Sequence, residues 1–141
     1  MASAGGLWYR WRMRALALAA ALAIGCAGAK APAARLPSGG SEQEARAALG
    51  RFAGAVEAGR WREAYALLSA RWRAAYTPER LGLDARGAGP LGREATERVQ
   101  ALLAAGTPLS GDGRTRTLPV GSGRAAVLVL EPEGWRVDAL E

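Results

Sequence analysis

The sequence of 141 residues contains no histidine, one cysteine and one lysine. Without histidine the chain lacks the usual general base near neutral pH, the serine–histidine and cysteine–histidine nucleophiles, and the commonest transition-metal ligand. The glycine-rich stretches at residues 82–92 and 111–113 match neither a phosphate-binding nor a dinucleotide-binding loop. We therefore expect no metal site and no cofactor.

Long hydrophobic runs are also missing. The apolar run at residues 15–24 has ten residues, so as a helix it spans about 15 Å of a hydrocarbon core about 30 Å thick. It follows Arg10, Arg12 and Arg14 and ends in small residues, which is the order of a secretory signal. Because cytoplasmic flanks are basic, we predict that the chain beyond residue 24 is exported.

Residues 22–26 read Leu-Ala-Ile-Gly-Cys and resemble the end of a bacterial lipoprotein signal, in which a small residue precedes a cysteine that is diacylated and becomes the mature N-terminus. The resemblance implies that residues 1–25 are removed and that Cys26 carries acyl chains such as palmitate, which hold the protein on a membrane. Acylation also explains a lone thiol in an oxidising compartment. The alternative is a plain signal, cleaved after Ala27 or Ala29, that releases a free protein.

The predicted location is the cell envelope. In lipoproteins an aspartate directly after the cysteine retains the protein in the inner membrane, and this chain has Ala27 there. The resemblance thus favours the outer membrane, facing the periplasm or the cell exterior, where the organism has one. The membrane is then a partner through the acyl chains on Cys26.

The positive charge of the whole chain comes partly from the signal. The net charge of +6 falls to +3 when residues 1–25 are removed, because three arginines leave and no acidic residue does. The remaining arginines are scattered singly, whereas a nucleic-acid footprint needs them clustered. We expect no nucleic-acid partner, and a weak attraction to anionic lipid headgroups stays open.

Two segments follow the signal. Residues 26–40 contain Pro32, Pro37 and the step Ser38-Gly39-Gly40 without apolar periodicity, which predicts a flexible tether. Such a tether reaches at most about 45 Å. Residues 41–141 number about one hundred, enough for a single small domain with one core.

The first half of this domain has helical periodicity. A capping-box pair, Ser41 and Glu44, starts a helix that Gly59 ends, and a second continuous helix is expected over residues 61–76. Thr77 and Pro78 begin a short third helix, residues 82–92 are expected to form a loop, and residues 93–105 a fourth helix closed by Gly106.

The second half has strand periodicity. Residues 115–120, 124–130 and 135–140 are separated by short glycine-containing turns, which predicts a three-stranded antiparallel meander. Pro119 cannot donate to a ladder, so the first strand is expected at an edge or with a bulge. In the last strand, simple alternation places Trp135, Val137 and Ala139 on one face and Arg136 and Asp138 on the other. The fold class is α+β, with N-terminal helices on a small sheet.

This order of elements resembles the nuclear transport factor 2-like superfamily, also described as cystatin-like α+β, and in particular its small secreted or lipid-anchored members of unknown function. The markers are Phe52, the stretch Ala-Tyr-Ala-Leu-Leu-Ser at residues 64–69, and Gly-Trp-Arg-Val at residues 134–137. The resemblance implies helices packed on a cone-shaped sheet, and the three predicted strands correspond to a reduced form of that cone. These are packing markers, so they inform the fold more than the chemistry.

Candidate site residues follow from that resemblance and from residue type. Enzymes of the superfamily, such as isomerases and dehydratases, use Asp, Tyr or His inside the cone, which singles out the catalytic candidates Asp84, Asp138, Tyr65 and Tyr76. The ordinary roles of these residues are a turn for Asp84, a solvated surface for Asp138, and half-buried core phenols for the tyrosines. The ligand-pocket candidates are Trp61, Tyr65, Trp72 and Trp135.

Three functions stay open at this point. The first is a non-enzymatic, lipid-anchored envelope protein whose domain binds a protein partner or a small apolar ligand. The second is an isomerase- or dehydratase-type enzyme, favoured by a pocket lined by Trp61, Tyr65, Trp72 and a carboxylate. The third is an anchored scaffold that oligomerises through its sheet, favoured by an exposed apolar face around Ala126, Leu128 and Leu130.

Overall fold

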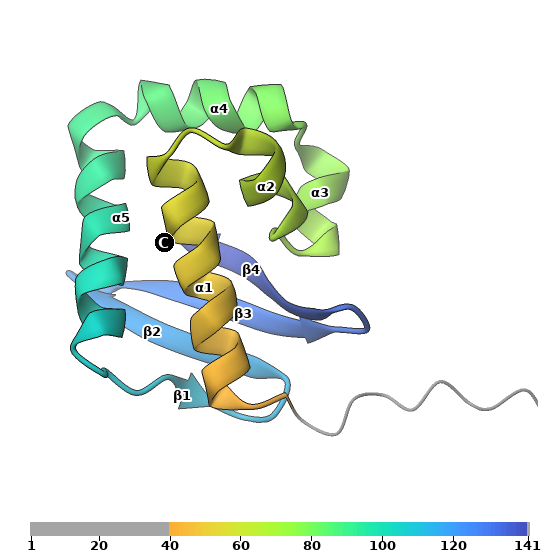
Figure 1. Ribbon diagram of the computed structural model, residues 1–141, viewed down its shortest axis with the longest axis vertical. Coiled ribbons are helices and arrows are strands. Elements are labelled where there is room, and N and C mark those ends of the chain that lie inside the picture. The colour runs from red at the N-terminus through yellow and green to blue at the C-terminus, as the bar shows by residue number, and fades with distance from the viewer. Residues whose placement is uncertain (1–39, 141) are drawn as a thin grey trace, which may run out of the picture. The chain divides into compact units, whose positions relative to one another are not determined.

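The helices precede the strands and cover one face of the sheet (Figure 1). The computed structural model describes residues 40–140, so the predicted signal, Cys26 and nearly all of the predicted tether lie outside the described residues. Within them the chain is α+β, with five helices and one open antiparallel sheet of four strands. No helix in residues 40–140 is both long and apolar enough to cross a membrane.

Helix α1 (Glu42–Glu57) begins as the sequence predicts. The Ser41 hydroxyl accepts from the Glu44 amide at 3.1 Å, and the Ser41 amide donates to Glu44 Oε2 at 2.9 Å. This capping box satisfies two amides that the first helical turn leaves without partners. One face of α1 is buried in the core, including Ala45, Leu49 and Phe52.

The predicted helix over residues 61–76 is wrong in one respect, because it is interrupted. Helix α2 (Trp61–Ala66) and helix α3 (Ala70–Ala75) are separated by three residues. There the Ser69 amide donates to the Val137 carbonyl and the Val137 amide donates to the Leu67 carbonyl, both at 2.8 Å. These bonds to a strand replace the helical ones, and Leu68 forms a parallel bridge with Val137.

The loop expected over residues 82–92 is also wrong. Helix α4 (Pro78–Gly87) starts at the predicted Thr77 cap, whose Oγ1 accepts from the Arg80 amide at 3.2 Å, but it continues through Gly82. Helix α5 (Gly89–Ala104) follows after a corner at Ala88. Gly82 is a packing residue, because a Cβ there would lie 2.9 Å from the indole of Trp61. Gly106, with φ of +74°, closes α5 as predicted.

The sheet has one strand more than predicted. Its order is β1 (Ser110–Gly111), β2 (Thr115–Gly121), β3 (Arg124–Glu131) and β4 (Gly134–Leu140), with neighbours antiparallel. Strand β1 has only two residues, too few for a period-2 pattern, which is why it escapes sequence analysis. The register of β2 against β3 shifts between Pro119 and Gly121, which confirms the irregularity expected at Pro119.

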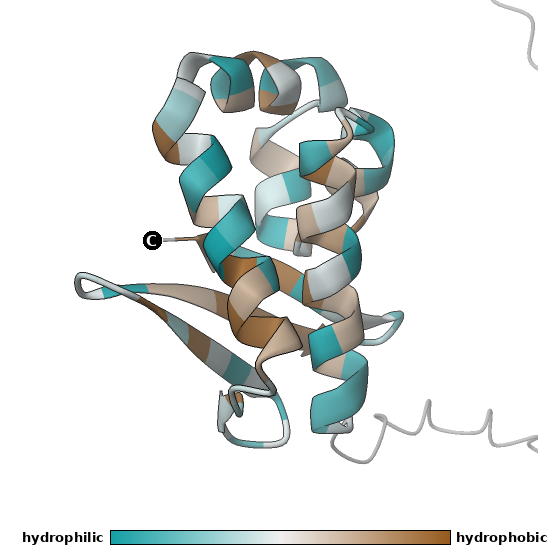
Figure 2. Cartoon of the chain, turned by 60° about the vertical axis from the view of Figure 1, so that its left-hand side comes forward, coloured by the Kyte–Doolittle hydropathy of each residue, from teal (hydrophilic) through white to brown (hydrophobic). Residues whose placement is uncertain are grey.

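The core lies between α1, α5 and the inner face of the sheet, where hydrophobic positions gather (Figure 2). Ala126 and Leu128 of β3 are fully buried there, and Leu130 is half-buried against the same cluster. These three residues therefore do not form the exposed apolar face that the scaffold hypothesis requires. Alternation along β3 places Ala126, Leu128 and Leu130 on the face that the helices cover, and Val127 and Val129 on the opposite face.

Candidate functional site

A bulge in β4 determines where Asp138 points. Val127 pairs with Ala139 and Leu128 pairs with Val137, which leaves Asp138 as an extra residue on β4. A bulge of this kind re-aims a side chain relative to simple alternation. The prediction that Asp138 lies opposite Trp135, in solvent or beside Arg136, is therefore wrong.

The Asp138 carboxylate is held by side chains of the α2–α3 region. Its Oδ1 accepts from the Ser69 hydroxyl at 2.6 Å, and its Oδ2 accepts from Arg71 Nη2 at 2.9 Å. The Asp138 main-chain oxygen accepts from the Trp72 indole N–H, and the Arg71 guanidinium lies 5.2 Å from the Trp72 ring centre. Asp138 thus joins α3 to β4 by an ion pair, a hydroxyl bond and a main-chain bond.

Asp84 lies on α4 and not in a loop. Arg80, one turn earlier, places its Nε 3.0 Å from Asp84 Oδ1. A hydrogen bond from the Tyr76 hydroxyl to the Asp84 carboxylate raises the pKa of Tyr76 above its ordinary value, and burial and the negative charge of Asp84 act in the same direction. Tyr76 also packs edge-on against Trp72, with ring centres 5.3 Å apart.

These groups surround a pocket of about 270 Å³ between α1, α3, α4 and β4, which we call the α3–β4 pocket. Its lining combines apolar side chains with two carboxylates and a phenol: Phe52, Leu68, Trp72, Tyr76, Leu81, Asp84, Val137, Asp138, Ala139 and Leu140. Phe52, Leu68 and Val137 are buried, so the deep part is apolar. Such a pocket can hold an apolar group and offer hydrogen bonds at one side.

The structure brings together four of the seven candidate site residues. Trp72, Tyr76, Asp84 and Asp138 line the α3–β4 pocket although they come from α3, its C-terminal end, α4 and β4. Sequence reasoning missed the floor residues Phe52 and Leu68 as pocket residues. Their helical spacing predicts only that they face inward, because the same pattern describes a filled core and an open one.

The other three candidates lie elsewhere. Trp61 packs against Gly82 of α4, with the Arg86 guanidinium 6.0 Å from its ring centre. The Tyr65 hydroxyl donates to the Arg73 carbonyl at 2.8 Å, which is the half-buried phenol with one bond that we expect for a core tyrosine. Trp135 is 3% exposed and packs against Gly40. The pocket named as favouring an enzyme, with Trp61, Tyr65 and Trp72 together, is not formed.

Larger grooves lie outside this pocket, and two of them border α1. One, of about 480 Å³, runs between the end of α1 and the α4–α5 corner and includes Trp61. The other, of about 610 Å³, lies between α1 and the turn that joins β3 to β4. We place the candidate site in the smaller α3–β4 pocket because it has a buried apolar floor and gathers most of the candidate residues.

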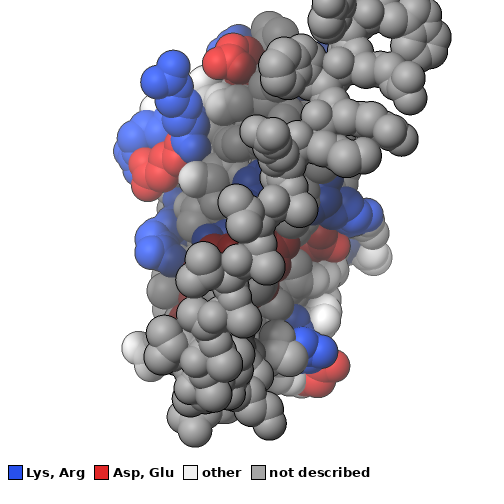
Figure 3. Space-filling model, turned by 90° about the vertical axis from the view of Figure 1, so that its right-hand side faces the viewer, with Lys and Arg blue, Asp and Glu red and all other residues white. Residues whose placement is uncertain are grey.

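Charges on the domain surface are mostly neighbours of opposite sign. Six arginines of the described region form ion pairs within 4.0 Å: Arg46, Arg60, Arg71, Arg73, Arg80 and Arg98. Where grey atoms do not cover the face in Figure 3, basic and acidic side chains lie beside one another. In residues 40–140 no group of three or more acidic, cysteine or histidine side chains could hold a metal ion.

Comparison of the chain with protein-family models, with curated proteins and with solved structures finds no match.

Proposed function

We propose that this protein is a non-enzymatic, lipid-anchored protein of the cell envelope whose domain binds a small apolar ligand. The observation that carries the ligand-binding part is the α3–β4 pocket, with its buried apolar floor and its few polar groups. The anchoring part is supported by the order of basic, apolar and small residues before Cys26 and by the absence of a second cysteine.

The pocket limits the size of the ligand. Its volume of about 270 Å³ falls just under the range of about 300–1,000 Å³ for sites of drug-sized molecules. The ligand is therefore a smaller molecule, with an apolar body toward Phe52 and Leu68. A hydrogen-bonding group on it would face Tyr76 and Asp84 on the α4 side.

Binding is favoured over catalysis because both carboxylates of the pocket already have partners. Asp138 accepts from Ser69 and Arg71, and Asp84 pairs with Arg80. A general base must reach and accept a substrate proton, and here the oxygens of both carboxylates already contact partners within the domain. The runner-up, an isomerase or dehydratase, is supported by the meeting of Tyr76, Asp84 and Asp138 in one pocket.

We further propose that the domain is a small member of the nuclear transport factor 2-like superfamily. Support comes from the helices on one face of an antiparallel sheet and from a pocket between those helices and the last strand. The open sheet of four strands fits a reduced cone.

The pocket is tested with N-phenyl-1-naphthylamine, a neutral dye that fluoresces in apolar surroundings. Leu81→Trp fills the pocket from α4, and we expect it to weaken dye binding at least tenfold. The matched control is Leu83→Trp on the same helix, because Leu83 is 57% exposed and outside the pocket lining. Equal binding by both variants, or no binding by the unsubstituted protein, would refute the ligand-binding proposal.

The anchor is tested with Cys26→Ser in cells labelled with palmitate. We expect the variant to lose both the label and its partition into the detergent phase. A variant that keeps both would overturn the anchor and leave the pocket proposal standing.

A further inference from the structure

The largest groove described above lies where the chain enters the domain. One wall is a single face of α1, with Ser41, Glu44, Ala48 and Arg51, and the other is the turn between β3 and β4 together with Arg136. Gly40 lies at one end of this α1–hairpin groove. The groove therefore begins beside the predicted tether and extends along α1 toward Arg51.

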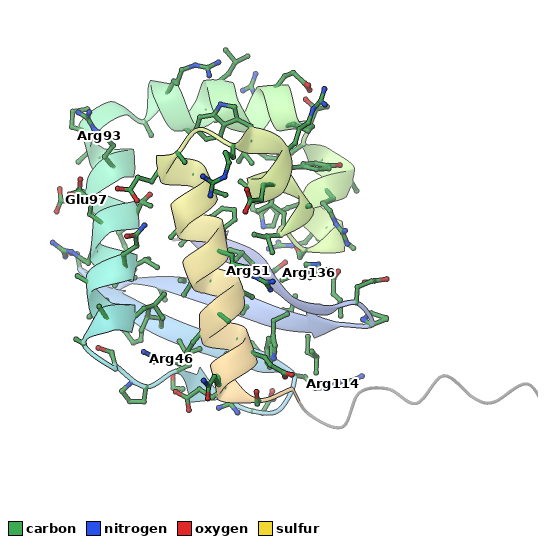
Figure 4. The ribbon with its side chains drawn as sticks, in the orientation of Figure 1. Arg46, Arg51, Arg93, Glu97, Arg114 and Arg136 are labelled. Atoms are coloured by element: carbon green, nitrogen blue, oxygen red, sulfur yellow. The ribbon has the colours of Figure 1, made fainter. Side chains whose placement is uncertain are left out.

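Two arginines occupy the far end of the groove. Arg51 belongs to α1 and Arg136 to β4, and both line the groove (Figure 4 labels them). Neither belongs to an ion pair of the described region, unlike six other arginines of the domain. Two positive charges that line one groove repel each other, and an anion bound between them reduces that repulsion.

Arg136 also has an unused donor. Its Nη1 donates to the Trp135 carbonyl at 3.1 Å and its Nη2 to the Glu133 carbonyl at 3.4 Å, which orients the guanidinium. Its Nε is buried and has no hydrogen-bond partner among the described residues. A buried donor without a partner is unfavourable, and Arg116 Nε and Trp135 Nε1 are also without one.

The carboxylates that line the groove form no ion pair with these two arginines. Glu44 is committed to the capping box with the Ser41 amide, and it precedes Arg51 by seven residues, about 10 Å along the helix. Glu133 is exposed on the turn, and the bond it makes with Arg136 uses its main-chain oxygen. The arginine end of the groove thus keeps its positive charge.

We propose that Arg51 and Arg136 bind the phosphate of an anionic phospholipid headgroup. Two guanidinium groups offer planar pairs of donors that match the oxygens of a phosphate. The anion site itself follows from the arginines, whereas the choice of a lipid phosphate over a free one rests on the proposed anchor at Cys26. The predicted tether of residues 26–40 joins the domain at Gly40, which lines the same groove, so the attachment point lies on this face.

The test uses the full chain with Cys26→Ser, so that acylation does not contribute. Vesicles of phosphatidylglycerol and phosphatidylcholine in equal parts are compared with vesicles of phosphatidylcholine alone. We expect Arg51→Gln/Arg136→Gln to weaken binding to the anionic vesicles at least tenfold more than the charge-matched control Arg62→Gln/Arg124→Gln, whose residues lie outside the groove. Arg136→Lys, which keeps the charge and loses the planar donors, should fall between.

Calorimetric titration with inorganic phosphate distinguishes the two sources. Phosphate binding that the Arg51/Arg136 variant loses, combined with equal vesicle binding by all variants, would overturn the lipid assignment and leave a free-phosphate site. Equal losses in the test and control variants would show a diffuse charge effect and overturn the site altogether. Far-ultraviolet circular dichroism checks the fold of each variant. If the double variant is misfolded, vesicle binding by Arg136→Lys tests the site in its place. The palmitate experiment is separate, so failure of the anchor and failure of this site are told apart.

Discussion

Replacing Gly82 by alanine should destabilise the domain although alanine is the better helix former. Gly82 lies inside α4, where the indole of Trp61 packs directly against its backbone. An added Cβ would lie 2.9 Å from Cδ1 and 3.0 Å from Cγ and Nε1 of that ring. Carbon atoms in contact normally lie about 3.5–4.0 Å apart, so the ring or the helix has to move.

Two opposing effects set the magnitude. Alanine in a helix interior is favoured over glycine by about 1 kcal/mol. Forcing an extra carbon into a packed contact costs about 1–3 kcal/mol, and the Trp61 ring has little room to yield because Gly59 and Arg86 also lie against it. We expect a net loss of up to about 2 kcal/mol. A loss of 1 kcal/mol lowers the Tm of a domain of this size by about 4–8 °C.

Gly54→Ala is the matched control. Gly54 lies inside α1, and a Cβ there would meet no atom within 4 Å. This variant keeps only the helix-propensity gain, so it should be more stable by about 1 kcal/mol. Urea unfolding followed by tryptophan fluorescence measures both variants. A Gly82→Ala protein as stable as the Gly54→Ala protein would contradict the packing argument.

Two other predictions concern single hydrogen-bonded groups. The pKa of Tyr76 is raised above 10.0 in the folded state, so the folded protein binds this proton more tightly than the unfolded chain does. The resulting stabilisation is present below pH 10 and is lost as the pH rises through the folded pKa. Asp84→Asn should lower that pKa toward its ordinary value, as phenolate absorbance with Tyr76→Phe as the blank would report, and an unchanged titration would exclude the bond. Ser41→Ala removes the capping box and should cost about 1 kcal/mol in urea unfolding, whereas Ser41→Gly should cost only a few tenths; an alanine variant of full stability would show that the cap does not limit α1.

Local patterns in the sequence predicted the structure correctly wherever the interacting residues are close together in the chain. The Ser41–Glu44 box, the Thr77 cap and the Gly106 terminus all appear where their residue types predict. The hairpin turns are likewise confirmed, because each depends on a few adjacent residues. The helices-first, strands-second order of the α+β fold follows from the same local patterns.

Predictions failed where a distant residue competes with the local pattern. Residues 67–69 continue the helical stripe, yet their backbone bonds to Val137 of β4. Gly82 is typical of a helix end, but here it makes room for Trp61. Alternation on β4 predicts a solvated Asp138, while the bulge turns it toward Ser69 and Arg71. In each case the deciding contact is too far away in the sequence to leave a periodic signal.

The interruption between α2 and α3 and the bulge in β4 together form the candidate site. If residues 61–76 were one helix, they would extend about 24 Å in a straight line, and Trp72 would share the stripe of Trp61. The bonds between residues 67–69 and Val137 end α2, so Trp61 stays against α4 while Trp72 and Tyr76 reach β4. One residue further along β4, the bulge places Asp138 on the same side. The α3–β4 pocket is therefore a consequence of where helix and strand bonds compete, and a substitution that let α2 and α3 join should remove it.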